Sequence, residues 1–209
     1  MKLIGMLDSP YVRRVAISLS LLGLRFEHQP LSVFRDFAGF EKINPVVKAP
    51  TLVCDDGEVL MDSTLIIQYA EALARPRSLF PLAPAALQHD LHLLGLALAA
   101  TEKSVQLVYE RELRPAEKRH QPWVSRVTGQ LLSAYRELER EFAHGGHPVD
   151  SATIRQAGVT VGVAWYFTQR MLPGTVPVES CPSLAAFSAS AELLPEFRAA
   201  PYGDGTCRP

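Results

Sequence analysis

The stretch LDSPYVRR, residues 7–14, marks the point where a short apolar strand gives way to a helix. Before it, residues 2–7 form a run suited to a buried strand, and after it apolar residues recur at helical spacing as far as Leu22. Ser9 suits the N-cap because its side-chain oxygen can accept from N–H groups that the first turn leaves unpaired, and Pro10 suits the next position. A hydroxyl at this positive helix end can also donate to an anion. Ser9 is therefore either a cap alone or a cap with a second role.

A second stretch, VVKAPTLVCDDGEVLMDST at residues 46–64, indicates a loop, two strands joined by a tight turn, and the start of another helix. Asp56-Gly57 is a strong signal for a two-residue hairpin, because the favoured turn requires positive φ angles. Asp62 or Ser63 then caps a helix that runs to about Ala74. The predicted strands are 51–54 and 58–61, and the apolar face of the helix is predicted to hold Leu65, Ile66 and Tyr69.

Together these two stretches resemble the N-terminal domain of the glutathione S-transferase family. Three matches in this order and spacing carry the resemblance: Ser9-Pro10-Tyr11 after the first strand, Lys48-Ala49-Pro50 before the third, and Asp62-Ser63 ahead of the next helix. The likeness continues through an all-helical second half, so it covers nearly the whole chain. It is most similar to the bacterial, serine-type members, and it implies that Pro50 is cis.

The predicted elements of the first half follow the order β-α-β-α-β-β-α, which is a thioredoxin-like layout. The strands predicted at 2–7 and 25–30 flank the first helix in a βαβ unit and should therefore be parallel. Residues 31–44 fit either a short helix or an ordered loop. We expect an α/β thioredoxin-like domain at residues 1–76, a linker at 77–84 and an all-α domain at 85–209.

No strand pattern returns after the linker, and helical periodicity takes over. Thr153-x-x-Gln156 fits a capping box, in which the two side chains satisfy N–H groups reciprocally, so it predicts a helix start. The first long helix of this half is predicted at 85–114, and its apolar positions are Leu87, Leu91, Leu94 and Leu98. Further helices are predicted at 122–144, 182–194 and 195–200.

The resemblance implies that glutathione is bound by Lys48, Ala49, Pro50, Asp62 and Ser63. Ser63 at a helix N-terminus can meet the carboxylate of the γ-glutamyl group with its hydroxyl and backbone N–H. Asp62 can accept from the ammonium of the same group, and the main chain of Ala49 can pair with the peptide in β fashion. Lys48 either reaches an anionic group of the tripeptide or is an exposed, solvated lysine.

Ser9 is the predicted catalytic residue, as a hydrogen-bond donor to the glutathione thiolate rather than as a base or nucleophile. A hydrogen bond to a charged group contributes about 1.5–3 kcal/mol. That is enough to move a thiol pKa from about 8.5 toward 7. Tyr11 stands one turn beyond the position that tyrosine-type relatives use, so we expect it to line the electrophile pocket, between the domains.

Composition excludes several other classes of protein. With 21 basic and 22 acidic residues in 209, the net charge gives no attraction to nucleic acid or to a membrane surface. The absence of a membrane-spanning run and of a secretory segment predicts a cytoplasmic protein. Cys54 is expected in the core and Cys207 in an exposed tail, and no cysteine or histidine spacing supports a metal site.

The sequence therefore predicts a glutathione transferase that activates the thiol for attack on an electrophilic small molecule. The resemblance implies a homodimer, and peroxidase, dehalogenase and isomerase variants of the reaction stay open. The alternative is a non-catalytic protein on the same fold, a regulatory module similar to the stringent starvation proteins that bind RNA polymerase.

Overall fold

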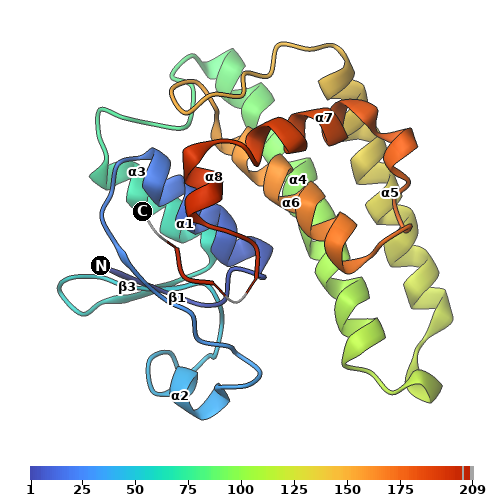
Figure 1. Cartoon of the computed structure of the whole chain (residues 1–209), viewed down its shortest axis with the longest axis horizontal. Helices are drawn as coiled ribbons and strands as arrows, with labels where there is room; N and C mark the ends of the chain where they lie inside the picture. The colour runs from blue at the N-terminus through green and yellow to red at the C-terminus, as the bar shows by residue number, and fades with distance from the viewer. Residues whose placement is uncertain (204, 208–209) are drawn as a thin grey trace. The chain divides into compact units, whose positions relative to one another are not determined.

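A computed structural model describes residues 1–203 and 205–207 of the chain (Figure 1). The residues divide into two compact units, a sheet unit and a helical unit. The sheet unit holds Met1–Leu79, Asp150–Thr153 and the segment from Leu193, and the helical unit holds Phe80–Val149 and Ile154–Glu192. The segment from Leu193 thus belongs with the sheet, although the sequence analysis assigned it to the helical domain.

The sheet unit is built on four short strands in the order β2-β1-β3-β4. β1 pairs with β2 in parallel, as the βαβ prediction required, while β1–β3 and β3–β4 are antiparallel. Helices α1 and α3 lie side by side on one face of this sheet, and α2 lies on the other side (Figure 1). The predicted thioredoxin-like order is confirmed. The strands are β1 (Lys2–Ile4), β2 (Glu27–Gln29), β3 (Thr51–Val53) and β4 (Val59–Met61), and the helices α1 (Pro10–Leu21), α2 (Phe37–Glu41), α3 (Ser63–Leu73) and α8 (Pro195–Ala199).

Strand β1 ends earlier than predicted because Gly5 follows it with φ +138°. A Cβ atom at Gly5 would lie 2.6 Å from Cγ2 of Val12, in the first turn of α1. Glycine is needed here, since any side chain would push the helix away from the strand. This close approach sets the position of Ser9 at the start of α1.

The turn between β3 and β4 differs from the predicted two-residue hairpin. The N–H of Gly57 donates to the carbonyl of Cys54 (3.1 Å), so Asp55 and Asp56 are the two central residues of the turn. Gly57 follows them with φ +89°. This is the three-residue loop in which glycine takes the left-handed position, and it explains why an Asp-Gly pair stands here without forming the shorter turn.

Helix α1 is buried on nearly all sides, including Arg13 and Arg14, each about 1% exposed. Arg13 Nε donates to the carbonyl of Ala200 (2.8 Å) and Nη2 to that of Phe197 (3.4 Å). Because these carbonyls end α8, Arg13 attaches the C-terminal segment to the sheet unit. Gly23, with φ +73°, ends α1 in the left-handed conformation, as predicted.

The buried face of α3 is one position away from the predicted one. Ile66, Ile67 and Ala70 are buried, whereas Leu65 and Tyr69 are exposed. The uncertain segment 31–44 contains the five-residue helix α2, in which Phe40 is buried. The wrong assignments arise because several apolar residues stand next to one another, so periodicity alone does not select the stripe that meets the core.

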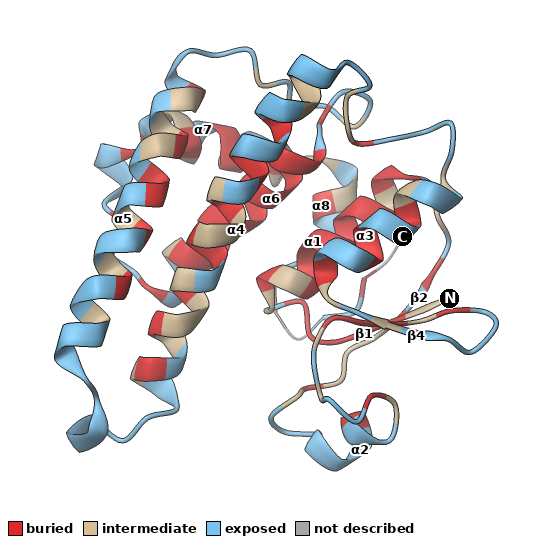
Figure 2. Ribbon diagram, turned by 180° about the vertical axis from the view of Figure 1, so that it is seen from behind, coloured by how far each residue is buried: buried red, intermediate tan, exposed pale blue. Residues whose placement is uncertain are grey.

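The helical unit packs α4 (Pro84–Glu112) against both α5 (Gln121–Ala143) and α6 (Gln156–Met171), and α7 (Pro182–Ala191) against α6. Figure 2 shows the buried stripe along α4 and the exposed outer side of α5. Of the four leucines that mark the apolar positions of α4 in the sequence, Leu94 is buried but Leu91 is exposed. The 3₁₀ helices are η1 (Ala116–Lys118) and η2 (Val178–Ser180).

A buried group of hydroxyls joins three of these helices. Tyr135 Oη on α5 lies 2.6 Å from Thr168 Oγ1 on α6 and donates to the carbonyl of Ala164 (2.9 Å). Ser104 Oγ on α4 lies 2.7 Å from the same Thr168 oxygen. Burial raises the pKa of Tyr135, so the phenol stays protonated and available as a donor.

The predicted capping box at the start of α6 is wrong. The N-cap is Arg155, without a side-chain cap, and Thr153 donates instead to the carboxylate of Asp150. The first turn of α6 is met from another helix: the carboxylate of Asp90, on α4, accepts from the backbone N–H of Ala157. Asp90 is 4% exposed, and its Oδ2 has no hydrogen-bond partner within the described part of the chain.

All three cysteines are buried. Cys54 is buried, as predicted, but Cys207 is buried as well, and its N–H donates to His28 Nδ1 (2.9 Å). Of the helices in residues 1–203 and 205–207, none combines the length and apolar composition needed to cross a membrane.

Candidate functional site

Three segments of the sheet unit that are far apart in the sequence are joined by direct contacts. A Cβ at Gly5 would lie 3.2 Å from Cβ of Ala49, so the loop before β3 lies against the end of β1. Lys48 Nζ lies 3.4 Å from Asp62 Oδ2. Arg14 Nη1 on α1 donates to Ser63 Oγ on α3 at 2.9 Å. The three predicted motifs therefore share one neighbourhood at this end of the sheet.

Ser9 is the N-cap of α1, in extended backbone geometry, with Pro10 following in the first turn. Its Oγ accepts from the N–H of Val12 at 3.4 Å, which is longer than a good hydrogen bond. The side chain is half-buried. A hydroxyl that only accepts in the cap keeps its own O–H to donate, so this geometry is compatible with both roles of Ser9.

The loop before β3 is held by two buried polar residues that the sequence analysis did not select. Asn44 Nδ2 donates to Thr51 Oγ1 (2.8 Å), and Thr51 Oγ1 donates to the carbonyl of Lys48 (2.7 Å). The Ala49–Pro50 bond is cis, as the resemblance implied. Val47 has φ +51°, which is rare for a β-branched residue and shows how tightly the loop conformation is imposed.

The third segment is the start of α3. Asp62 is its N-cap, with φ +71° and ψ 126°, and its Oδ1 accepts from the N–H of Thr64 (2.9 Å). Ser63, the first residue of the helix, is only 3% exposed. The first N–H groups of a helix have no intrahelical acceptor and carry the positive end of its dipole. An anion of the right shape is therefore favoured here.

Arg14 is a site residue that the sequence analysis missed. Its guanidinium donates to Ser63 Oγ and, at 3.3 Å, to Thr64 Oγ1. Burial lowers the pKa of Arg14 to about 10, while the nearby charges of Asp62 and Tyr11 act in the opposite direction. The signal was present in the sequence, because two adjacent arginines inside an apolar helix face need buried partners.

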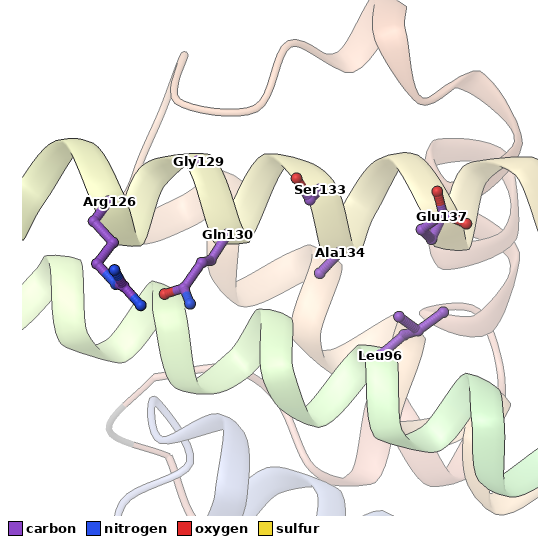
Figure 3. A pocket seen from close by; sticks show the side chains of 7 residues that line it. All are labelled: Leu96, Arg126, Gly129, Gln130, Ser133, Ala134 and Glu137. Carbon is purple, nitrogen blue, oxygen red and sulfur yellow. The ribbon is translucent and has the colours of Figure 1, made fainter.

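Tyr11 is half-buried and lies close enough to Arg14 to influence its charge. Its assignment to an electrophile pocket stays a prediction. A hollow of about 580 Å³ does lie along α4 and α5 of the helical unit, with Leu96 on one side and Gln130 and Arg126 extending from the other (Figure 3). None of the predicted site residues belongs to its lining, which also includes Gly129, Ser133, Ala134 and Glu137.

Among the described residues, no group of three or more His, Cys, Asp or Glu side chains is placed to hold a metal ion. The described site offers hydroxyls, one guanidinium, one ammonium, one carboxylate and two helix N-termini. Such a set suits an anionic, peptide-like ligand.

Known proteins with similar sequences indicate the family to which the chain belongs. Residues 3–78 match the profile described as the N-terminal domain of glutathione S-transferase. The chain is 30% identical over 180 residues to an uncharacterized GST-like protein, YibF, of Escherichia coli, covering 83% of this chain and 86% of that protein. It is 29% identical over 158 residues to maleylacetoacetate isomerase of Pseudomonas aeruginosa, covering 71% and 74%.

The fold is also similar to that of a solved structure from the same family of proteins. A glutathione transferase family member from Pseudomonas fluorescens Pf-5, with bound S-(propanoic acid)-glutathione, is 27% identical and superposes with a TM-score of 0.79, over 96% of this chain and 98% of that one. The thioredoxin-like domain and the following helical domain are therefore those of the related proteins, and the chain belongs to the glutathione S-transferase family.

Proposed function

We propose that this protein is a glutathione transferase of the serine type, which binds glutathione on the sheet unit and stabilises its thiolate for attack on an electrophilic small molecule. The observation that carries the proposal is the set of contacts by which the segments around Ser9, Ala49 and Ser63 are joined. The related structure from Pseudomonas fluorescens, which holds a glutathione conjugate, supports the choice of ligand.

In this proposal the two ends of the tripeptide are recognised by different groups. The γ-glutamyl carboxylate is bound by the hydroxyl and N–H of Ser63 at the start of α3, where the helix dipole favours an anion. The γ-glutamyl ammonium is bound by Asp62, whose carboxylate is half-exposed and close to Lys48. The main chain of Ala49, before Pro50, pairs with the cysteinyl residue in β fashion.

Ser9 acts on the thiol. Its O–H donates to the sulfur, and the positive end of α1 adds to the stabilisation of negative charge. The proton of the thiol is released to solvent, and the thiolate forms the carbon–sulfur bond with the electrophile. The reaction is addition where the electrophile has an activated double bond and substitution where it has a leaving group, and an isomerase variant stays open because of the Pseudomonas aeruginosa relative.

The family resemblance also supports the setting of the reaction in the cell and in the molecule. Tyr11 contributes to the electrophile pocket, and the protein acts in the cytoplasm as a homodimer. These parts rest on the family resemblance, and sedimentation or light scattering would test the dimer directly.

The experiment that tests the role of Ser9 is a titration of the bound thiol. With Ser9→Ala we expect nearly unchanged glutathione affinity but a bound-thiol pKa about one to two units higher, because the thiolate loses a charge-assisted donor. The rate with a generic electrophile at neutral pH falls about ten- to a hundredfold and recovers partly as pH rises. Thiolate absorbance against pH is the readout.

Two further variants make the titration specific. Ser9→Thr keeps a hydroxyl and should restore most of the lowered thiol pKa. The hydroxyl of Ser20, on the same helix, donates to the carbonyl of Ala16. Its removal in Ser20→Ala should leave the thiol titration unchanged. Superimposable thiolate titration curves for wild type and Ser9→Ala would leave Ser9 as a helix cap, with a stability cost of about 1 kcal/mol. Failure of the wild type to bind millimolar glutathione would favour the regulatory alternative.

A further inference from the structure

Two adjacent arginines of α1 have the same burial but different partners. Arg13 and Arg14 are each about 1% exposed. Arg13 donates to the carbonyls of Ala200 and Phe197 and lies over the Phe197 ring, 5.7 Å from its centre. These contacts attach the end of α8. Arg14 points to the first turn of α3, which lies beside α1 (Figure 1).

The contact of Arg14 with Ser63 fixes the direction of a hydroxyl. A serine oxygen has one O–H to donate and two lone pairs to accept. Arg14 Nη1 occupies a lone pair of Ser63 Oγ at 2.9 Å, and a guanidinium has no lone pair to accept in return. The Ser63 hydrogen must therefore turn away from Arg14, toward another acceptor. A second donor bond to Thr64 Oγ1 (3.3 Å) holds the guanidinium on this turn.

The charge of Arg14 adds to the positive end of α3. The nearest acidic group on the helix is Asp62, whose carboxylate is already engaged by the N–H of Thr64 and lies 3.4 Å from Lys48 Nζ. Lys48 thus offsets part of the negative charge of Asp62. The guanidinium of Arg14 and the dipole of α3 both place positive charge at this helix start, and positive charge there favours an anion.

We propose that Arg14 is a positioning residue for the carboxylate end of the bound peptide thiol: it orients the Ser63 hydroxyl to donate to that carboxylate and adds a buried positive charge behind it. This inference rests on the proposed function, since it assumes that Ser63 meets the γ-glutamyl carboxylate. It makes selectivity for a ligand with that carboxylate depend on a residue that does not touch the ligand.

The test compares two ligands by calorimetry. One is glutathione, and the other is its analogue 4-aminobutyryl-cysteinyl-glycine, in which hydrogen replaces the γ-glutamyl carboxylate. The quantity measured is the selectivity ratio, the dissociation constant of the analogue divided by that of glutathione. A general loss of structure weakens the binding of both ligands and leaves this ratio unchanged. For Arg14→Met we expect glutathione to bind about tenfold more weakly and the analogue to bind as it does to wild type.

The neighbouring arginine supplies a matched control. Arg13→Met removes a guanidinium of equal burial from the same helix and should lower thermal stability without changing the ratio. Arg14→Lys keeps the positive charge but loses the planar guanidinium. The selectivity ratio should therefore fall below the wild-type value by less than it does in Arg14→Met. If Arg14→Met does not fold, the double variant Arg14→Lys, Ser63→Ala is compared with Ser63→Ala alone. Because Arg14 acts through the Ser63 hydroxyl, the two should have the same selectivity ratio.

The outcomes separate this inference from the proposed function. An unchanged ratio in the folded Arg14 variants, or an equal change in Arg13→Met, overturns the positioning role while glutathione binding stands. A wild type that binds neither ligand overturns both the proposed function and this inference.

Discussion

Helices α3 and α6 both begin beside an aspartate, but the two carboxylates come from different places. Asp62 directly precedes α3 in the chain, and its side chain is 45% exposed. Asp90 comes from the neighbouring helix α4, is 4% exposed, and accepts from Ala157 in the first turn of α6. A cap from the preceding residue leaves the helix end open to solvent and to a ligand. A cap from a packed neighbour closes the helix end and joins two helices.

The contrast extends to the charge around each helix start. Arg14, Lys48 and the helix dipole all favour negative charge at α3, where the half-exposed Asp62 is the N-cap. At α6 a buried carboxylate already occupies the position where an anion would bind. One helix start is therefore a candidate binding site, and the other is a structural joint.

The largest effect that would distinguish the start of α3 from the start of α6 is the loss of glutathione affinity expected from Ser63→Ala. If Ser63 binds the γ-glutamyl carboxylate, glutathione affinity should fall by about 1.5–3 kcal/mol, because a hydrogen bond to a charged group is lost. The pKa of the bound thiol should hardly change, since Ser63 acts on the other end of the tripeptide. Calorimetry with glutathione measures the affinity.

Thr64→Val is the matched control, because it removes the second hydroxyl that Arg14 contacts in the same turn. Its effect on glutathione affinity should be several times smaller. Equal losses from both variants, or no loss from Ser63→Ala, would mean that Ser63 is part of the helix start and not of a binding site.

A somewhat smaller effect, on stability rather than on binding, is expected from Asp90→Ala. The N–H of Ala157 loses its acceptor in a buried setting, which should lower the free energy of unfolding by about 1–2 kcal/mol. Glutathione affinity should stay at the wild-type value, because Asp90 belongs to the helical unit. Chemical denaturation and calorimetry measure the two quantities, and a variant that weakens binding without losing stability would contradict the assignment of Asp90 as a structural cap.

The smallest effect is expected from Asp90→Asn, and it depends on pH. Burial raises the pKa of Asp90, although the Ala157 N–H and the charges of Arg155 and His89 act in the opposite direction. The stability that this carboxyl contributes is therefore present below its unfolded-state pKa of about 3.9 and is lost as pH rises through the higher folded-state value. Asparagine keeps an acceptor for Ala157 and does not ionise.

The stability of Asp90→Asn relative to wild type should accordingly rise as pH increases from about 4, the unfolded-state pKa, through the higher folded-state pKa. Urea unfolding at several pH values measures the difference, from which the contributions of the other ionisable groups cancel. A difference that stays constant with pH, or that falls as pH rises, would contradict the burial of an ionisable carboxylate at the start of α6.

The sequence was sufficient for features that depend on neighbouring residues. Ser9-Pro10 and Asp62-Ser63 mark helix starts because capping involves only the next few N–H groups, and both helices begin as expected. Apolar periodicity likewise predicted the thioredoxin-like order and the helical half. Where local chemistry offered two solutions, as in the turn at Asp55-Asp56-Gly57, the prediction chose the wrong one.

Tertiary structure decided whatever depends on a partner distant in the chain. Thr153 and Gln156 fit a capping box, yet the first turn of α6 is capped at Ala157 by Asp90, 67 positions earlier, because packing of α4 brought a carboxylate to that helix end. Arg13 and Arg14 are equivalent in the sequence, but one contacts Ala200 and the other Ser63. Local rules predict which residues can cap, turn or pack. Only the folded chain determines which buried group meets which, because each buried polar group must find its partner within the packed core.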